Sequence, residues 1–137
     1  MEPTQPTPHP RTFGKAERLC RQLLIDRLFA GGSKSLGSFP LRLVSLPVEE
    51  ADVRVPVSIL VSVPKKRFRR AVKRNRVKRQ VREAYRLNKH ILLDTVTRRQ
   101  LHLVMGFIWL GNELCSTQEV ERRVVNLLQR LSERLDA

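Results

Sequence analysis

Residues 65–86 read KKRFRRAVKRNRVKRQVREAYR, and this stretch carries the clearest signal in the chain. It holds 12 of the 27 Lys and Arg residues but only one acid, Glu83, so it has a formal charge of +11 out of the chain's +14. The rest of the chain is nearly balanced, with 15 basic and 12 acidic side chains. Because the excess positive charge is confined to one segment, the sequence indicates a polyanionic partner, and nucleic acid is the commonest one.

The same stretch has the periodicity of a two-faced helix. At about 100° per residue from Lys73, the apolar side chains of Val77, Val81, Ala84 and Tyr85 fall within one third of the helix circumference, with Arg74 at its edge. The opposite side is polar and basic, and consists of Asn75, Arg76, Lys78, Arg79, Arg82 and Arg86. This pattern predicts a helix that docks on a core and shows a continuous basic stripe to its surroundings.

Upstream of this helix, the sequence predicts one helix and two strands. The helix is expected over residues 16–30, where leucines recur at helical spacing, and Gly31 and Gly32 are suited to close it. The strands are expected over residues 40–46 and 55–63, with Pro56 at the start of the second. Residues 47–52 are expected to be a polar turn. Because the connection between the two strands is short, they are predicted to form a β-hairpin.

Downstream, the sequence predicts a connector, a buried strand and a final helix. Residues 88–100 are expected to be a mixed connector with a short helical turn over residues 90–93. The run LHLVMGFIWL over residues 101–110 is typical of a buried strand. Ser116 and Glu119 form a capping-box pattern, after which apolar residues repeat at helical spacing as far as Leu135.

The length of 137 residues predicts one domain. Residues 1–12 hold four of the eight prolines and are predicted to be a flexible tail, which leaves residues 13–137 as a single RNA-binding domain. Cys20 and Cys115 are far apart and the three histidines are scattered, which argues against a zinc site or a disulfide framework. No apolar run reaches the ~18 residues of a membrane span and the N-terminus lacks a signal-peptide pattern, so a cytoplasmic protein is expected.

The residues of the basic helix leave three interpretations open. It is a solvated face without a partner, a recognition helix for the DNA major groove, or a binder of the RNA backbone. The first is disfavoured because an uncompensated run of like charges repels itself. The second lacks the preceding helix of a helix-turn-helix motif, since a strand is predicted there. For the third, Arg side chains bind phosphates through two N–H groups, and Asn75 can reach a base edge or a 2′-hydroxyl.

The order VSVPKK followed by KRNRVKRQVREAYR resembles the bacterial ribonuclease P protein subunit family, whose helix carries an Arg-Asn-Arg core, here Arg74, Asn75 and Arg76. FGKAERL at residues 13–19, LFAGG at 28–32 and the run at 101–110 also fall in the expected places, so the resemblance spans about residues 13–135. There are departures. The family usually has Ser at the position of Pro64, and one residue is inserted between Lys66 and Ala71. Ile25 and Val44 stand where aromatic residues are common.

The resemblance implies a fold and a function. The fold is α+β, a small two-layer α/β sandwich similar to the second domain of ribosomal protein S5, with a left-handed βαβ crossover made by the basic helix. The protein is implied to be the subunit of ribonuclease P that pairs with a catalytic RNA, which removes the 5′ leader from precursor tRNA. In this family Mg²⁺ is bound mainly by the RNA, and the protein grips the leader and supports metal binding.

The resemblance and the charge pattern together predict the site residues. The RNA-binding set is Lys65, Lys66, Arg69, Arg70, Lys73, Arg74, Asn75, Arg76, Lys78, Arg79 and Arg82. Phe29 matches an aromatic of the leader-binding cleft, with core packing as the alternative, and Phe13 is a candidate to cover one end of that cleft. The remaining large aromatics are expected to pack in the core or at its edge, and these are Phe39, Phe68, Tyr85, Phe107 and Trp109. No protein residue is predicted to be catalytic.

Two other functions compete with this prediction. One is a ribosomal or general RNA-binding protein without a role in cleavage, which would bind RNA but would not lower the magnesium needed to process precursor tRNA. The other is a DNA-binding regulator, which requires a dimerisation element that only the last helix offers.

Overall fold

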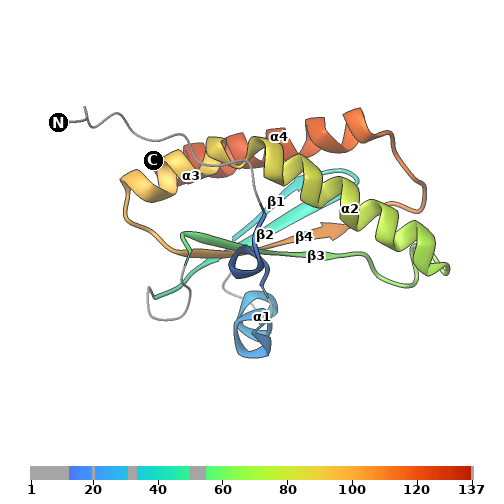
Figure 1. Cartoon of the computed structure of the whole chain (residues 1–137), viewed down its shortest axis with the longest axis horizontal. Coiled ribbons are helices and arrows are strands. Elements are labelled where there is room, and N and C mark those ends of the chain that lie inside the picture. The colour runs from blue at the N-terminus through green and yellow to red at the C-terminus, as the bar shows by residue number, and fades with distance from the viewer. Residues whose placement is uncertain (1–12, 20, 31–33, 50–54, 137) are drawn as a thin grey trace.

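The computed structural model describes residues 13–19, 21–30, 34–49 and 55–136, and Figure 1 shows a sheet with α2, α3 and α4 over one face and α1 on the other. The strands are β1 (Lys34–Ser38), β2 (Leu41–Pro47), β3 (Val57–Ser62) and β4 (Leu103–Trp109). The helices are a short 3₁₀ turn η1 (Lys15–Glu17), α1 (Gln22–Phe29), α2 (Ala71–Asn88), α3 (His90–Arg98) and α4 (Thr117–Asp136). The predicted α+β class is confirmed. The predicted tail and the glycines expected to close the first helix lie outside the described residues.

The strand order in the sheet is β1-β2-β4-β3, and this order corrects one prediction. The two strands that were expected to form a hairpin, now β2 and β3, do not pair, because β4 lies between them. The hairpin is instead β1–β2, which turns at Phe39 and Pro40. β4 is buried along almost its whole length, which suits a central strand covered on both faces. β1 was missed because KSLGS has only one large apolar residue.

β3 and β4 are parallel neighbours, and α2 with α3 makes the crossover between them (Figure 1). Parallel neighbours need such a connection because the chain must return to the end of the sheet where the first strand began, which a tight turn cannot do. The predicted connector at residues 88–100 is therefore mostly helix: α3 spans His90–Arg98 and buries Leu92, Leu93 and Val96. α3 packs beside α4, where the Thr95 and Ser132 hydroxyls share a hydrogen bond of 2.5 Å.

The N-terminal segment covers the open edge of β3 before α1 begins. Arg18 pairs with Ile59, and the Leu19 N–H donates to the Ile59 carbonyl oxygen at 2.7 Å. The helix predicted over residues 16–30 is therefore shorter at its start, and α1 spans only Gln22–Phe29. Pairing an exposed edge satisfies backbone groups that would otherwise be free to bind other strands.

A nearly buried ion pair holds this segment against the helical layer. The Lys89 Nζ donates to Glu17 Oε2 at 2.7 Å, and Lys89 is only 4% exposed. Phe13 packs edge-to-face on Tyr85 of α2, with 6.0 Å between ring centroids. Because breaking one partner of a buried pair leaves an uncompensated charge, this contact is a strong constraint on where the segment lies.

Two apolar cores lie on the two faces of the sheet. The larger core lies under α2, α3 and α4, and includes the predicted inner face of α2 (Val77, Val81, Ala84, Tyr85) and that of α4. The smaller core lies under α1 and joins Leu24 and Leu28 to Val44 and Val104 of the sheet. The predicted cap of α4 is confirmed, since the Glu119 N–H donates to Ser116 Oγ at 3.1 Å. None of the helices among the described residues is long and apolar enough to span a membrane.

Candidate nucleic-acid interface

The loop between β3 and α2 is anchored by apolar residues and presents its cations outward. Val63 and Phe68 are buried in the larger core. Four cations of this loop are exposed, and they are Lys65, Lys66, Arg69 and Arg70. The Arg67 N–H donates to the Pro64 carbonyl oxygen at 3.0 Å, which closes a turn at Pro64.

The outer face of α2 continues this basic surface. Lys73, Asn75, Arg76 and Arg79 are exposed, whereas Lys78 and Arg82 are half-buried. The division of α2 into an apolar and a basic face is therefore confirmed. One polar residue of α2 departs from this pattern: Gln80 is buried and donates from Nε2 to the Cys115 carbonyl oxygen at 3.1 Å and to Thr117 Oγ1 at 3.2 Å. These bonds tie the middle of α2 to the start of α4.

Arg74 is directed toward the protein backbone. Its Nη1 donates to the carbonyl oxygens of Phe68 and Arg69, both at 2.8 Å, and the side chain is half-buried. Arg74 therefore holds the loop in the shape that presents the neighbouring cations. Its position at the edge of the apolar arc was the only signal of this role in the sequence.

The positive charge of this surface is largely uncompensated. Among the described residues, no ion pair involves Lys73, Arg76, Lys78 or Arg79. The single acid of α2, Glu83, accepts from Arg86 Nε at 2.9 Å, and this hydrogen bond lowers the pKa of Glu83. Partial burial, and to a smaller extent the nearby charge of Arg18, lower the pKa of Arg82.

Phe29 lies on the opposite face of the sheet, at the end of α1. Its ring is 47% exposed, and its Cζ is 3.4 Å from the position that a Cβ on Gly106 would occupy. Gly106 thus lets the ring approach the strand closely. Ile25 and Val44 pack in the smaller core beside it and make this surface aliphatic.

Phe13 and Phe29 are not brought into one cluster. Phe13 packs against the larger core on Tyr85, and the guanidinium of Arg18 lies 5.5 Å from the centre of the Phe13 ring. Of the two candidate cleft aromatics, Phe29 is the one that lies on the open sheet surface.

Four of the five remaining large aromatics are buried as predicted, and the fifth is not. Phe68, Tyr85, Phe107 and Trp109 belong to the larger core. Phe39 is 69% exposed at the β1–β2 turn. Its packing was predicted wrongly, because the hairpin that this residue belongs to was not recognised.

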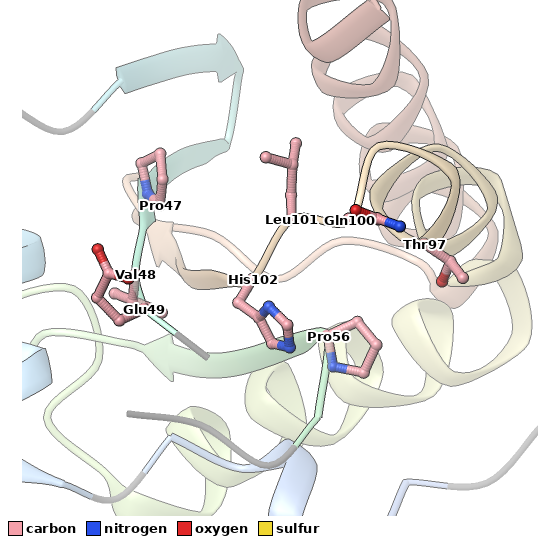
Figure 2. Close-up of a pocket in the computed structure, with 8 residues that line it drawn as sticks. All are labelled: Pro47, Val48, Glu49, Pro56, Thr97, Gln100, Leu101 and His102. Carbon is pink, nitrogen blue, oxygen red and sulfur yellow. The ribbon is translucent and has the colours of Figure 1, made fainter. Parts of the chain in front are cut away.

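A cavity of about 650 Å³ lies at the end of the sheet away from the basic loop (Figure 2). It is lined by residues 47–49 and Pro56 from the strand ends, and by Thr97 and residues 100–102 after α3. Its described lining contains no Lys or Arg, so it does not extend the basic surface. Within the described ranges, no group of three or more His, Cys, Asp or Glu side chains lies where it could hold a metal ion.

These features define a small α+β protein with one strongly basic helical face and a separate, mostly aliphatic sheet surface. The chain belongs to the ribonuclease P protein family, because the Ribonuclease P family model matches residues 13–132. It is 48% identical over 125 residues to the ribonuclease P protein component of Porphyromonas gingivalis, an alignment that covers 90% of each chain. It is 33% identical over 138 residues to that of Chlorobium phaeobacteroides, covering 91% of this chain and 92% of the relative.

Solved structures of the family share the fold. The Staphylococcus aureus RNase P protein superposes with a TM-score of 0.67 at 19% identity, over 85% of this chain and 96% of that one. The RNase P protein from Thermotoga maritima gives a TM-score of 0.62 at 24% identity, over 83% and 96%. The chain is thus a protein subunit of ribonuclease P, a ribonucleoprotein of tRNA processing, and family membership implies association with the ribonuclease P RNA.

Proposed function

We propose that the exposed cations of the 65–70 loop and of α2 bind RNA phosphates, and that the chain thereby assists the RNA subunit in removing the 5′ leader of precursor tRNA in the cytoplasm. The observation that carries this proposal is the outer face of α2, where Lys73, Arg76 and Arg79 are exposed without acidic partners among the described residues. Such a surface releases counterions from RNA on binding, which favours association and makes it sensitive to salt.

The proposed roles differ among the predicted residues. Lys65, Lys66, Arg69 and Arg70 extend the phosphate-binding surface along the loop, and Lys78 and Arg82 contribute from the half-buried flank. Asn75 is exposed between two cations and can donate to a base edge or a 2′-hydroxyl. Arg74 contributes chiefly by holding the loop through its two carbonyl contacts.

We assign the leader to the sheet face that carries Phe29. Phe29 is half-exposed at the end of α1 and lies close to Gly106 of β4, which makes its ring a suitable stacking platform, and stacking of one base contributes about 1–3 kcal/mol. The aliphatic neighbours Ile25 and Val44 offer shape but no second ring, so Phe29 supplies the aromatic contact there.

We assign Mg²⁺ to the RNA. The protein's influence on magnesium is then its placement of RNA phosphates, which the exposed cations of the 65–70 loop and of α2 would hold.

The test is cleavage of a precursor tRNA by a bacterial ribonuclease P RNA at low millimolar Mg²⁺, with and without the protein. We expect the protein to restore correct 5′ processing, and Phe29→Ala to weaken binding of precursor tRNA more than binding of mature tRNA. Unchanged cleavage together with salt-sensitive RNA binding would instead identify a general RNA-binding protein.

A further inference from the structure

Three segments meet at the end of the sheet where β4 finishes (Figure 1). The Leu110 N–H donates to the Pro40 carbonyl oxygen at 2.7 Å, which joins the segment after β4 to the β1–β2 turn. The basic loop joins them from the other side, because Arg67 Nη1 donates to Asn112 Oδ1 at 3.3 Å. Residues 110–112 therefore link the β1–β2 turn on one side to the loop that leads into α2 on the other.

A cavity of about 320 Å³ lies at this junction, with Phe39 and Pro40 on one side and residues 111–115 on the other. Gly111, in the wall of this cavity, allows the backbone after β4 to lie close to Pro40 and Trp109, since a Cβ there would lie 3.0 Å from Pro40 Cβ and 3.3 Å from Trp109 Nε1. The volume is at the lower end of the ~300–1,000 Å³ typical of small-ligand sites, which suits one planar group.

Phe39 is the most exposed aromatic ring among the described residues, at 69%. Exposed rings beside basic segments are the usual platform for unpaired bases, because every base has a face that stacks. The charges around the cavity favour a base over a phosphate as its occupant. The wall itself carries an acid, Glu113, which repels phosphate but can accept from a base amino group, whereas the cations lie outside in the 65–70 loop.

We propose that Phe39 and this cavity bind one unpaired RNA base, while the flanking phosphates contact the exposed cations of the 65–70 loop. The inference rests on the proposed function, since it takes RNA as the partner. It adds a second stacking residue at the end of the sheet, separate from Phe29 on the sheet face.

The experiment compares two fluorescein-labelled probes of ten nucleotides, a single-stranded RNA and an abasic ribose-phosphate chain of the same charge. Binding is measured by fluorescence anisotropy at several salt concentrations. We expect Phe39→Ala to weaken binding of the RNA by roughly 5- to 100-fold, leave the abasic probe unaffected and leave the salt slope unchanged. Phe39→Trp should restore binding, since it keeps a stacking ring.

Leu23→Ala is the matched control, because Leu23 is similarly exposed at 65% but lies on α1. Binding of the RNA by Phe39→Ala at wild-type affinity overturns the inference, as does an equal loss on both probes. In either case, a wild-type protein that binds the RNA in a salt-sensitive way leaves the proposed function standing. A wild-type protein that binds neither probe nor the ribonuclease P RNA overturns the proposed function itself.

Discussion

α2 and α4 are the two longest helices among the described residues, and they pack side by side over the same core. They differ in how far acidic side chains compensate their cations. α2 carries seven Lys and Arg residues against one acid, whereas α4 carries four arginines against four acids. In α4, Arg122 and Arg123 both bind Glu119, at 2.8 and 3.0 Å. The comparison shows that compensation by acids, more than the number of cations, separates the positive face of α2, which we propose to bind RNA, from the nearly neutral face of α4.

The arginines of α4 also serve the fold directly. Arg130 Nη1 donates to the Gly37 carbonyl oxygen of β1 at 2.6 Å, and Arg98 of α3 binds Asp136 at the end of α4 at 2.8 Å. An exposed ion pair such as Arg98–Asp136 contributes little stability, but its opposite charges cancel the local field. α4 therefore secures the edge of the sheet and adds little to the positive potential, which stays concentrated on α2.

The largest effect is expected where the two helices are alike, on their shared inner face. Leu127 of α4 is fully buried, so Leu127→Ala should lower the free energy of unfolding by about 2–5 kcal/mol. Chemical denaturation measures this, with the exposed Gln129→Ala as control. A loss below about 1 kcal/mol would show that α4 is less integral to the core than its burial indicates.

The next largest effect is expected on RNA binding, which should differ between the outer faces of α2 and α4. We expect the double variant Arg76→Gln and Arg79→Gln to weaken binding of the ribonuclease P RNA by roughly tenfold to a hundredfold, and to lower the salt slope by about 1.4–1.8. The matched double variant on α4, Arg122→Gln and Arg123→Gln, should stay within about twofold, because these cations are already paired. Equal losses in filter-binding or anisotropy titrations would erase the distinction between the two helices.

A smaller effect separates two neighbours on α2. Arg74→Ala should lower the free energy of unfolding by about 1–3 kcal/mol, since two carbonyl oxygens lose their charged donor, whereas Arg76→Ala should leave stability unchanged. Hydrogen exchange should report faster exchange in residues 65–70 for the Arg74 variant only. If both variants unfold alike, Arg74 does not hold the loop.

The smallest effect concerns one carboxylate on each helix. Hydrogen bonds from Arg86 and Arg98 lower the pKa of Glu83 and of Asp136 respectively. A depressed pKa stabilises the fold above the unfolded-state pKa of about 4, and this contribution disappears as the pH falls through the folded value. Glu83→Gln and Asp136→Asn should therefore be slightly less stable than wild type at pH 7 and equal to it in strong acid. Persistence of the difference in strong acid would show a cause other than charge.

Most of the site was predictable from the sequence because it depends on local pattern. The charge of residues 65–86 and the periodicity of α2 determine which side chains face outward, and exposure of Lys73, Arg76 and Arg79 follows from these alone. Arg74 and Phe39 were not predictable in the same way. The role of Arg74 depends on where the loop backbone passes, and the exposure of Phe39 depends on a hairpin with a weakly apolar first strand.

The sequence by itself determined the elements with strong periodicity, the two faces of α2, the cap of α4 at Ser116 and the concentration of charge. Only the tertiary structure decided the strand order, the helical state of residues 90–98 and the cavity that Phe39 shares with residues 111–115. The physical reason is that side-chain pattern selects which face of an element is buried, whereas strand pairing uses backbone groups that nearly every residue offers alike. Which strand lies beside β2 is therefore settled by the packing of the whole chain.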